Sequence, residues 1–165
     1  MKKSVKILSG SLIVVIAGGY VLLNKVICPL KFEDSIKKYS TQYNVDPYLV
    51  ASVINNESRF KEITNYDSQD KNGIIQVREF VAVKWANEMG LKNFEPKDIA
   101  KTDVSINMAC WYLSKANGDK ATSWVNRNVK EDTSNKFSDK DIKLTAKSIN
   151  DNITLYKIAH PFLKK

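Results

Sequence analysis

The stretch YNVDPYLVASVINNESRF, residues 43–60, decides the fold of this chain. It contains Asp46-Pro47, an N-cap residue followed by proline at the first helical position, which is a typical helix start. The apolar residues that follow recur on one side of a helix, and they are Leu49, Val50, Val53 and Ile54. The sequence therefore predicts a helix over residues 47–58 with one apolar stripe.

Glu57 continues this stripe, because it lies four residues after Val53 and three after Ile54. The predicted helix thus directs a carboxyl group along its buried face. Burial without a cationic partner favours the protonated form, which a general acid requires. The alternative is a glutamate whose stem packs while its head group reaches water or pairs with Arg59. On periodicity alone this alternative is the stronger one.

Helical patterns continue on both sides of this segment, and no stretch alternates as a strand does over a useful length. Turn residues and helix stops separate the patterns, among them Gly90 and Pro161. The further helices are expected from about residue 32 to 44, over 75–89, from Asp103 to about 117, over 124–129 and from Ser138 to about 160, with a loop over 61–72. Ser138 and Asp141 resemble a capping box. The fold class is all-α.

The N-terminus predicts a membrane segment. Three lysines within residues 1–6 precede an uncharged run of about 17 residues, near the lower limit for a transmembrane helix. The lysines predict a cytoplasmic N-terminus, so residues 29–165 form an extracytoplasmic domain behind a single-pass anchor within residues 1–28, membrane-embedded over 7–27. Two alternatives stay open, namely secretion after cleavage of a signal peptide and lipidation of Cys28.

Charge and composition narrow the function classes. The net charge is +8, but four of the 26 basic residues precede residue 28 and all 18 acidic residues follow it, so the remainder carries +4. No block of basic residues alternates with aromatic ones, which argues against nucleic-acid binding. Cys28 and Cys110 lack metal-ligand spacing and His160 is the one histidine, so no metal site and no cofactor are expected.

Three ordered motifs over residues 36–115 change the interpretation of Glu57. They are the run Tyr43 to Val50 with Glu57-Ser58 closing the helix, then Gly73-Ile74-Ile75-Gln76, then Ile106-Asn107 with Trp111-Tyr112-Leu113. Together they resemble the soluble lytic transglycosylase family, whose patterns are Y-x-V-D-P-x-L with E-S, G-L-M-Q, and N-I-x-x-G-x-x-Y-L. Each motif alone is weak, but their order and spacing are fairly specific.

The resemblance implies a lysozyme-like domain with a groove for peptidoglycan glycan strands. It makes Glu57 the sole catalytic acid and base, cleaving the bond between N-acetylmuramic acid and N-acetylglucosamine and leaving 1,6-anhydro ends. Ser58, Ser68, Ile75 and Gln76 fall on family positions near the groove. Plain structural roles remain equally open, namely a helix C-terminal hydroxyl for Ser58, a core residue for Ile75 and a polar side chain early in a helix for Gln76.

The sequence also departs from the family pattern. Asp70-Lys71 stand where the family has Gly-Ala, and the register of Ser68 against Asp67 is open by one residue. After Leu113, the helix ending in Y-N-A-G, whose tyrosine supports the catalytic acid, is not recognisable. Either another residue such as Tyr112 or Tyr156 supports Glu57, or the site has lost activity.

Several functions follow from these observations. The leading one is a lytic transglycosylase acting on peptidoglycan. A hydrolytic muramidase on the same scaffold needs a second carboxylate or a positioned water, and Asp67 and Asp70 are its candidates. A non-catalytic wall-binding or assembly protein is the alternative from another class. A tethered partner of a secretion or conjugation apparatus is compatible with the first function.

Overall fold

The computed structural model describes residues 17–127 and 138–164. Their elements follow one another as η1 (Leu23–Ile27), α2 (Glu33–Gln42), α3 (Pro47–Ser58), β1 (Lys71–Asn72), β2 (Val77–Arg78), α4 (Glu79–Met89), η2 (Pro96–Ala100), α5 (Thr102–Lys115), α6 (Lys120–Asn126) and α7 (Asp139–Ala159). The fold is mostly helical and agrees with the predicted class, with one small β-hairpin in addition.

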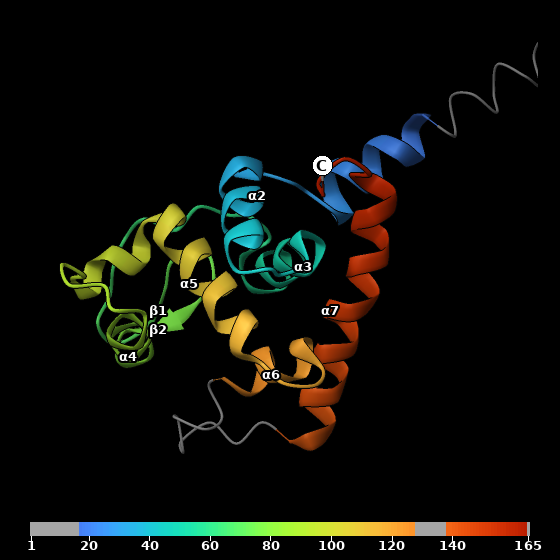
Figure 1. Ribbon diagram of the computed structural model, residues 1–165. Coiled ribbons are helices and arrows are strands. Elements are labelled where there is room, and N and C mark those ends of the chain that lie inside the picture. The colour runs from blue at the N-terminus through green and yellow to red at the C-terminus, as the bar shows by residue number, and fades with distance from the viewer. Residues whose placement is uncertain (1–16, 128–137, 165) are drawn as a thin grey trace, which may run out of the picture.

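Helix α3 lies at the centre of the domain and packs against α2, α5, α6 and α7, whereas α4 packs against α5 (Figure 1). The carboxylate of Asp46 accepts a hydrogen bond from the backbone N–H of Tyr48 at 3.0 Å, so the predicted cap and start are confirmed. Every residue from Pro47 to Ile54 is buried. The helix is therefore enclosed on all sides over its first two turns, rather than amphipathic as the apolar stripe predicted.

Helix α7 runs along one side of the molecule and packs against both α3 and α6 (Figure 1). It begins at the predicted cap, where the hydroxyl oxygen of Ser138 accepts from the backbone N–H of Asp141 at 3.2 Å. At the other end, the hydroxyl of Tyr48 donates to the carbonyl oxygens of His160 and Pro161. The C-terminal end of α7 is thus tied to the start of α3.

A two-stranded antiparallel hairpin, β1 with β2, was missed by the sequence analysis. Strands of two residues are too short to show an alternating pattern. The turn between them starts at Gly73, whose φ is +67°. Because this turn and β2 take up residues 73–78, the helix expected from residue 75 begins only at Glu79; its predicted end at Gly90 is confirmed.

Two further helix starts differ from prediction. Helix α5 begins at Thr102, and Asp103 lies in its first turn, where its carboxylate accepts from the hydroxyls of Ser35 and Tyr39. Helix α6 begins at Lys120, because the carboxylate of Asp119 accepts from the backbone N–H of Thr122 at 3.0 Å. The expected helix over 124–129 is therefore earlier and ends at Asn126; residues 128 and 129 lie outside the described residues.

Residues 17–27 leave the domain as a helical segment that ends in η1. The next residues are fastened to the domain: the side-chain amide of Asn55 donates to the Ile27 carbonyl at 3.0 Å, and the hydroxyl of Tyr156 donates to the Pro29 carbonyl at 2.7 Å. Cys28 is fully buried and its thiol is free. Residues 27–29 are therefore fastened to the domain by side chains of α3 and α7.

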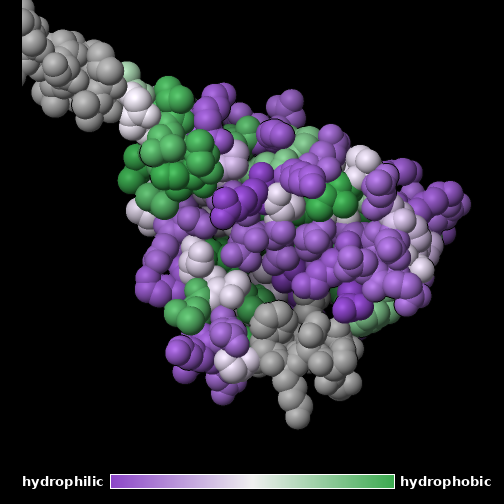
Figure 2. Space-filling model, turned by 180° about the vertical axis from the view of Figure 1, so that it is seen from behind, coloured by the Kyte–Doolittle hydropathy of each residue, from purple (hydrophilic) through white to green (hydrophobic). Residues whose placement is uncertain are grey.

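Hydrophobic residues gather where this segment joins the domain, on a face that is otherwise mostly hydrophilic (Figure 2). The exposed large apolar residues of the segment are Tyr20, Val21, Leu22, Val26 and Ile27. Within the described residues, no helix combines the length and apolar character needed to cross a membrane. Much of the anchor predicted over residues 7–27 lies outside the described residues, and it stays a prediction.

Gly73 should be far less tolerant of a side chain than other glycines of the same backbone conformation. A Cβ at residue 73 would lie 2.2 Å from the Ile99 carbonyl oxygen and 2.3 Å from the Ser105 hydroxyl. We expect Gly73→Ala to lower the free energy of unfolding by about 3–5 kcal/mol, through left-handed strain and overlap together. Urea unfolding of the variant measures this.

Gly90→Ala is the matched control, since Gly90 has a φ of +72° and open space around its Cβ position. It should cost only the conformational strain, about 1–2 kcal/mol. Equal losses for the two variants would contradict the close approach of the hairpin turn to α5.

Candidate active site

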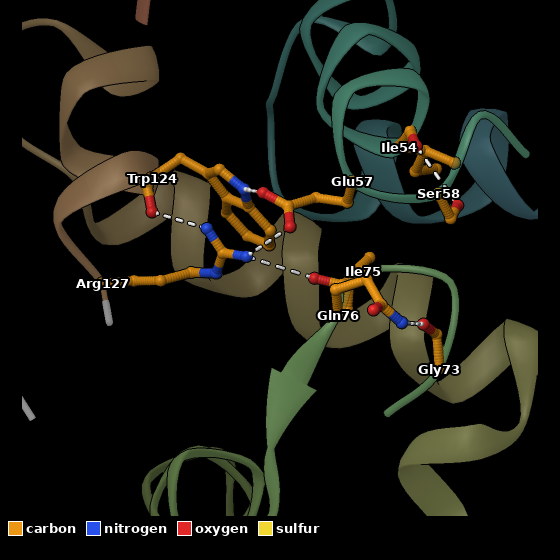
Figure 3. Close-up of polar contacts among 8 residues, drawn as sticks. All are labelled: Ile54, Glu57, Ser58, Gly73, Ile75, Gln76, Trp124 and Arg127. Atoms are coloured by element: carbon orange, nitrogen blue, oxygen red, sulfur yellow. Dashed lines mark hydrogen bonds and ion pairs between the residues drawn. The ribbon is translucent and has the colours of Figure 1, made fainter. Parts of the chain in front are cut away.

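Glu57 lies in the last turn of α3 and points toward the end of α6 (Figure 3). Its side chain is 12% exposed. The buried first two turns of α3 leave the helix little freedom to shift, so the backbone holds Glu57 at the edge of the core. The predicted direction of this carboxyl group, along the inner side of the helix, agrees with the structure.

Trp124 of α6 supports one oxygen of this carboxyl group. Its indole Nε1–H donates to Glu57 Oε1 at 2.9 Å. The indole is fully buried and packs against Trp85 at 6.2 Å and edge-on against Tyr112 at 5.8 Å between ring centroids. This aromatic cluster fixes the donor, because a side chain packed on several sides cannot change rotamer without opening the core.

Arg127, directly after α6, binds the other oxygen. Its Nη2 lies 2.9 Å from Glu57 Oε2, and only 2% of its side chain is exposed. The same guanidinium donates to the carbonyl oxygens of Ile75 at 3.2 Å and Trp124 at 2.9 Å, and its carbon lies 4.0 Å from the Trp124 ring centroid. The expectation that Glu57 has no cationic partner is thus wrong, and so is the alternative pairing with Arg59, because the structure pairs Glu57 with Arg127.

The structure brings one of the four predicted substrate-binding residues to this cluster. Ile75 is fully buried and reaches Arg127 through its backbone carbonyl. Gln76 turns its side-chain amide back to the Gly73 carbonyl at 2.9 Å, and the Ser58 hydroxyl donates to the Ile54 carbonyl at 3.2 Å (Figure 3). Ser68 is exposed in a turn of the loop before β1. Gln76 and Ser58 thus make local contacts in this structure.

The residues expected to assist Glu57 also make other contacts. The hydroxyl of Tyr112 donates to the Ser123 carbonyl at 3.0 Å, and that of Tyr156 donates to the Pro29 carbonyl. The carboxylates of Asp67 and Asp70 each accept a backbone N–H of their own turn. An indole, rather than a tyrosine hydroxyl, therefore donates to Glu57 here.

The chemistry available at this site is proton transfer. Both partners of the Glu57 carboxyl group within the described residues are donors, since indole and guanidinium have no lone pair to offer. Such a group can accept a proton as a base and, once protonated, donate it as an acid. A single carboxyl group at the edge of a helical core is suited to general acid and base chemistry on a bound polymer.

The family model of the transglycosylase SLT domain matches residues 34–129. The chain belongs to this family. The matched region of the SLT domain runs from α2 through α6, so it includes Trp124 and Arg127, beyond the motifs that carried the resemblance. No curated protein matches the chain. At the level of the family, membership supports cleavage of glycosidic bonds in peptidoglycan.

Trp124 and Arg127 are the partners of Glu57 that the sequence analysis missed. They lie three residues apart and therefore share one side of a helical turn. The segment before Arg127 mixes polar and apolar residues, with Lys120, Thr122 and Ser123 ahead of Trp124-Val125, so the sequence gives no signal that this arginine is buried. Buried charges are paired, but the sequence does not indicate which carboxyl group the arginine meets.

The indole N–H should contribute measurably to the position of Glu57. We expect Trp124→Phe, which keeps an aromatic ring and removes the donor, to lower the free energy of unfolding by about 1.5–3 kcal/mol. In a Glu57→Gln background the same change should cost less, about 0.5–1.5 kcal/mol, because the acceptor is then uncharged. Equal costs in the two backgrounds, measured in a double-mutant cycle, would show that the bond to Glu57 does not carry the effect.

Proposed function

We propose that this SLT domain is a peptidoglycan lytic transglycosylase in which Glu57 is the single catalytic acid and base. The fixed position of the Glu57 carboxyl group is the observation that supports the proposal most. Glu57 ends the central helix, is nearly buried, and has one oxygen fixed by Trp124 within the region matched by the family model. A fixed carboxyl group avoids the entropic cost of orienting the acid in each turnover.

In the first step, protonated Glu57 donates its proton to the glycosidic oxygen between N-acetylmuramic acid and N-acetylglucosamine. The bond from C1 of the muramic acid to that oxygen breaks, and the N-acetyl group of the same sugar stabilises C1. In the second step, the Glu57 carboxylate takes the proton of the C6 hydroxyl, and O6 closes on C1. The product is a 1,6-anhydro end, Glu57 is protonated again, and no water is consumed.

One carboxyl group suffices for this scheme because the substrate supplies the nucleophile. Hydrolytic glycosidases that use water commonly need a second carboxylate to activate it or to attack C1. The two candidates for that role, Asp67 and Asp70, accept hydrogen bonds from backbone N–H groups within their exposed turn. These local contacts favour the transglycosylase over the muramidase, which remains an outcome of the test below.

We further propose that residues 1–28 carry a membrane anchor that places the domain outside the cytoplasm, where peptidoglycan lies. The three lysines before the uncharged run support this orientation. The attachment of residues 27–29 to Asn55 and Tyr156 would then hold the domain at a fixed angle to the anchor. In the absence of detergent, the full chain should stay in the membrane fraction, and a chain without residues 1–28 should not. This result would support the anchor.

Glu57→Gln should abolish release of glycan fragments from purified peptidoglycan. The amide keeps the shape of the side chain but cannot donate the proton, so we expect the rate to fall by at least about 10²–10³. Glu88→Gln is the matched control, since Glu88 is an exposed glutamate on α4, and its rate should equal that of the parent chain. Fragment release that survives Glu57→Gln would contradict the role of Glu57.

The mass of the released ends distinguishes the chemistries. Reaction in ¹⁸O-water should give anhydro ends without the heavy isotope if O6 is the nucleophile. Ends heavier by one labelled water would establish hydrolysis instead. Folded protein that binds peptidoglycan but releases nothing at any pH would indicate a wall-binding or assembly protein.

A further inference from the structure

The ion pair between Glu57 and Arg127 conflicts with the first step of the proposed reaction. The pair is 2.9 Å long and nearly sealed from solvent, with 2% of the arginine side chain and 12% of the glutamate side chain exposed. Attraction between opposite charges is strong where water is excluded. In the arrangement that the structure shows, the positive charge of Arg127 therefore lies against an oxygen of the group that, as a general acid, must present a proton to the substrate.

Trp124 and Arg127 both donate to the carboxyl group, one to each oxygen. Among the residues that the structure describes, the other groups that contact the guanidinium are uncharged, namely the Trp124 ring and the carbonyl oxygens of Ile75 and Trp124. Arg59, the charged residue nearest to Glu57 along the chain, is exposed at the end of α3.

We propose that Arg127 is a positioning residue that holds the Glu57 carboxyl group in an ion pair in the free protein, and that a glycan strand must replace this guanidinium at Glu57 before the bond can be cleaved. The inference rests on the proposed function and adds a control of its charge state. Release of Arg127 removes the positive charge that opposes protonation of Glu57. When Glu57 has donated its proton, Arg127 can pair with it again and stabilise the carboxylate formed.

The contacts of Arg127 make such an exchange feasible. The guanidinium keeps two carbonyl acceptors and the face of the Trp124 ring if Glu57 turns away. Glutamate has three side-chain torsions, so its carboxyl group can pivot about the bond to Trp124 Nε1 while α3 stays in place. The movable partner is thus Glu57, and Arg127 keeps the bonds of Nη1 and Nη2 to the two carbonyl oxygens.

The pH profile of kcat/KM on peptidoglycan tests this proposal. Arg127→Met removes the charge, so the high-pH limb, where Glu57 loses its proton, should move upward by about 1 pH unit or more. Arg127→Lys keeps the charge and should stay close to the parent chain. Arg59→Met removes an equal charge from the exposed end of α3 and should leave the limb unchanged.

Coincident profiles for the parent chain and Arg127→Met would overturn the proposal. So would a uniform loss of activity at all pH values with the limb unmoved, which is the result for a purely structural arginine. Arg127→Gln is a second neutral variant for the case in which Arg127→Met does not fold. Its side-chain amide retains a donor for the Ile75 carbonyl.

A readout without turnover separates this inference from the proposed function. Carbon-13 NMR of labelled glutamate follows protonation of the Glu57 carboxyl group directly, with Glu57→Gln identifying the signal. The midpoint of protonation should move to higher pH in Arg127→Met or Arg127→Gln and stay in Arg127→Lys. A parent chain that cleaves no glycan would refute the proposed function, while an unmoved NMR midpoint would refute the role of Arg127.

Discussion

The contact of the Glu57 carboxyl group with two donors from the end of α6 is the constraint on which the rest of this structure depends. Helix α3 is enclosed over residues 47–54, so its last turn delivers a carboxyl group to the edge of the core. A carboxyl group in that place is costly unless hydrogen bonds compensate it. Trp124 and Arg127 provide them, and the aromatic cluster on α4 and α5 holds Trp124 in turn.

The same contact explains how the chain departs from its family pattern and still builds a site. Only four residues separate α5 from α6, where the family pattern expects a longer helix ending in Y-N-A-G. The short link brings α6 directly against the end of α3 and α7. An indole takes the place of the expected tyrosine hydroxyl, and an arginine adds a charge that the motifs did not predict.

The central helix, its cap and the position of Glu57 could be predicted because their signals are local. Asp46-Pro47 and the apolar stripe lie within a dozen residues of Glu57, and Ser138 marks the start of α7 in the same way. The partners of Glu57 could not be predicted, since Trp124 lies 67 residues away along the chain. Gln76 illustrates the converse, because a family position near the groove serves here as a turn residue with φ of +51°.

The measurement that tests the account most directly is a crystal structure of the Glu57→Gln variant with an uncleaved glycan tetrasaccharide. The account predicts that the scissile glycosidic oxygen lies within about 2.6–3.2 Å of the side chain at position 57. It also predicts that the Arg127 guanidinium no longer contacts that side chain, while its bonds to the Ile75 and Trp124 carbonyls remain. A glycan bound elsewhere on the domain, with position 57 still facing Arg127, would contradict it.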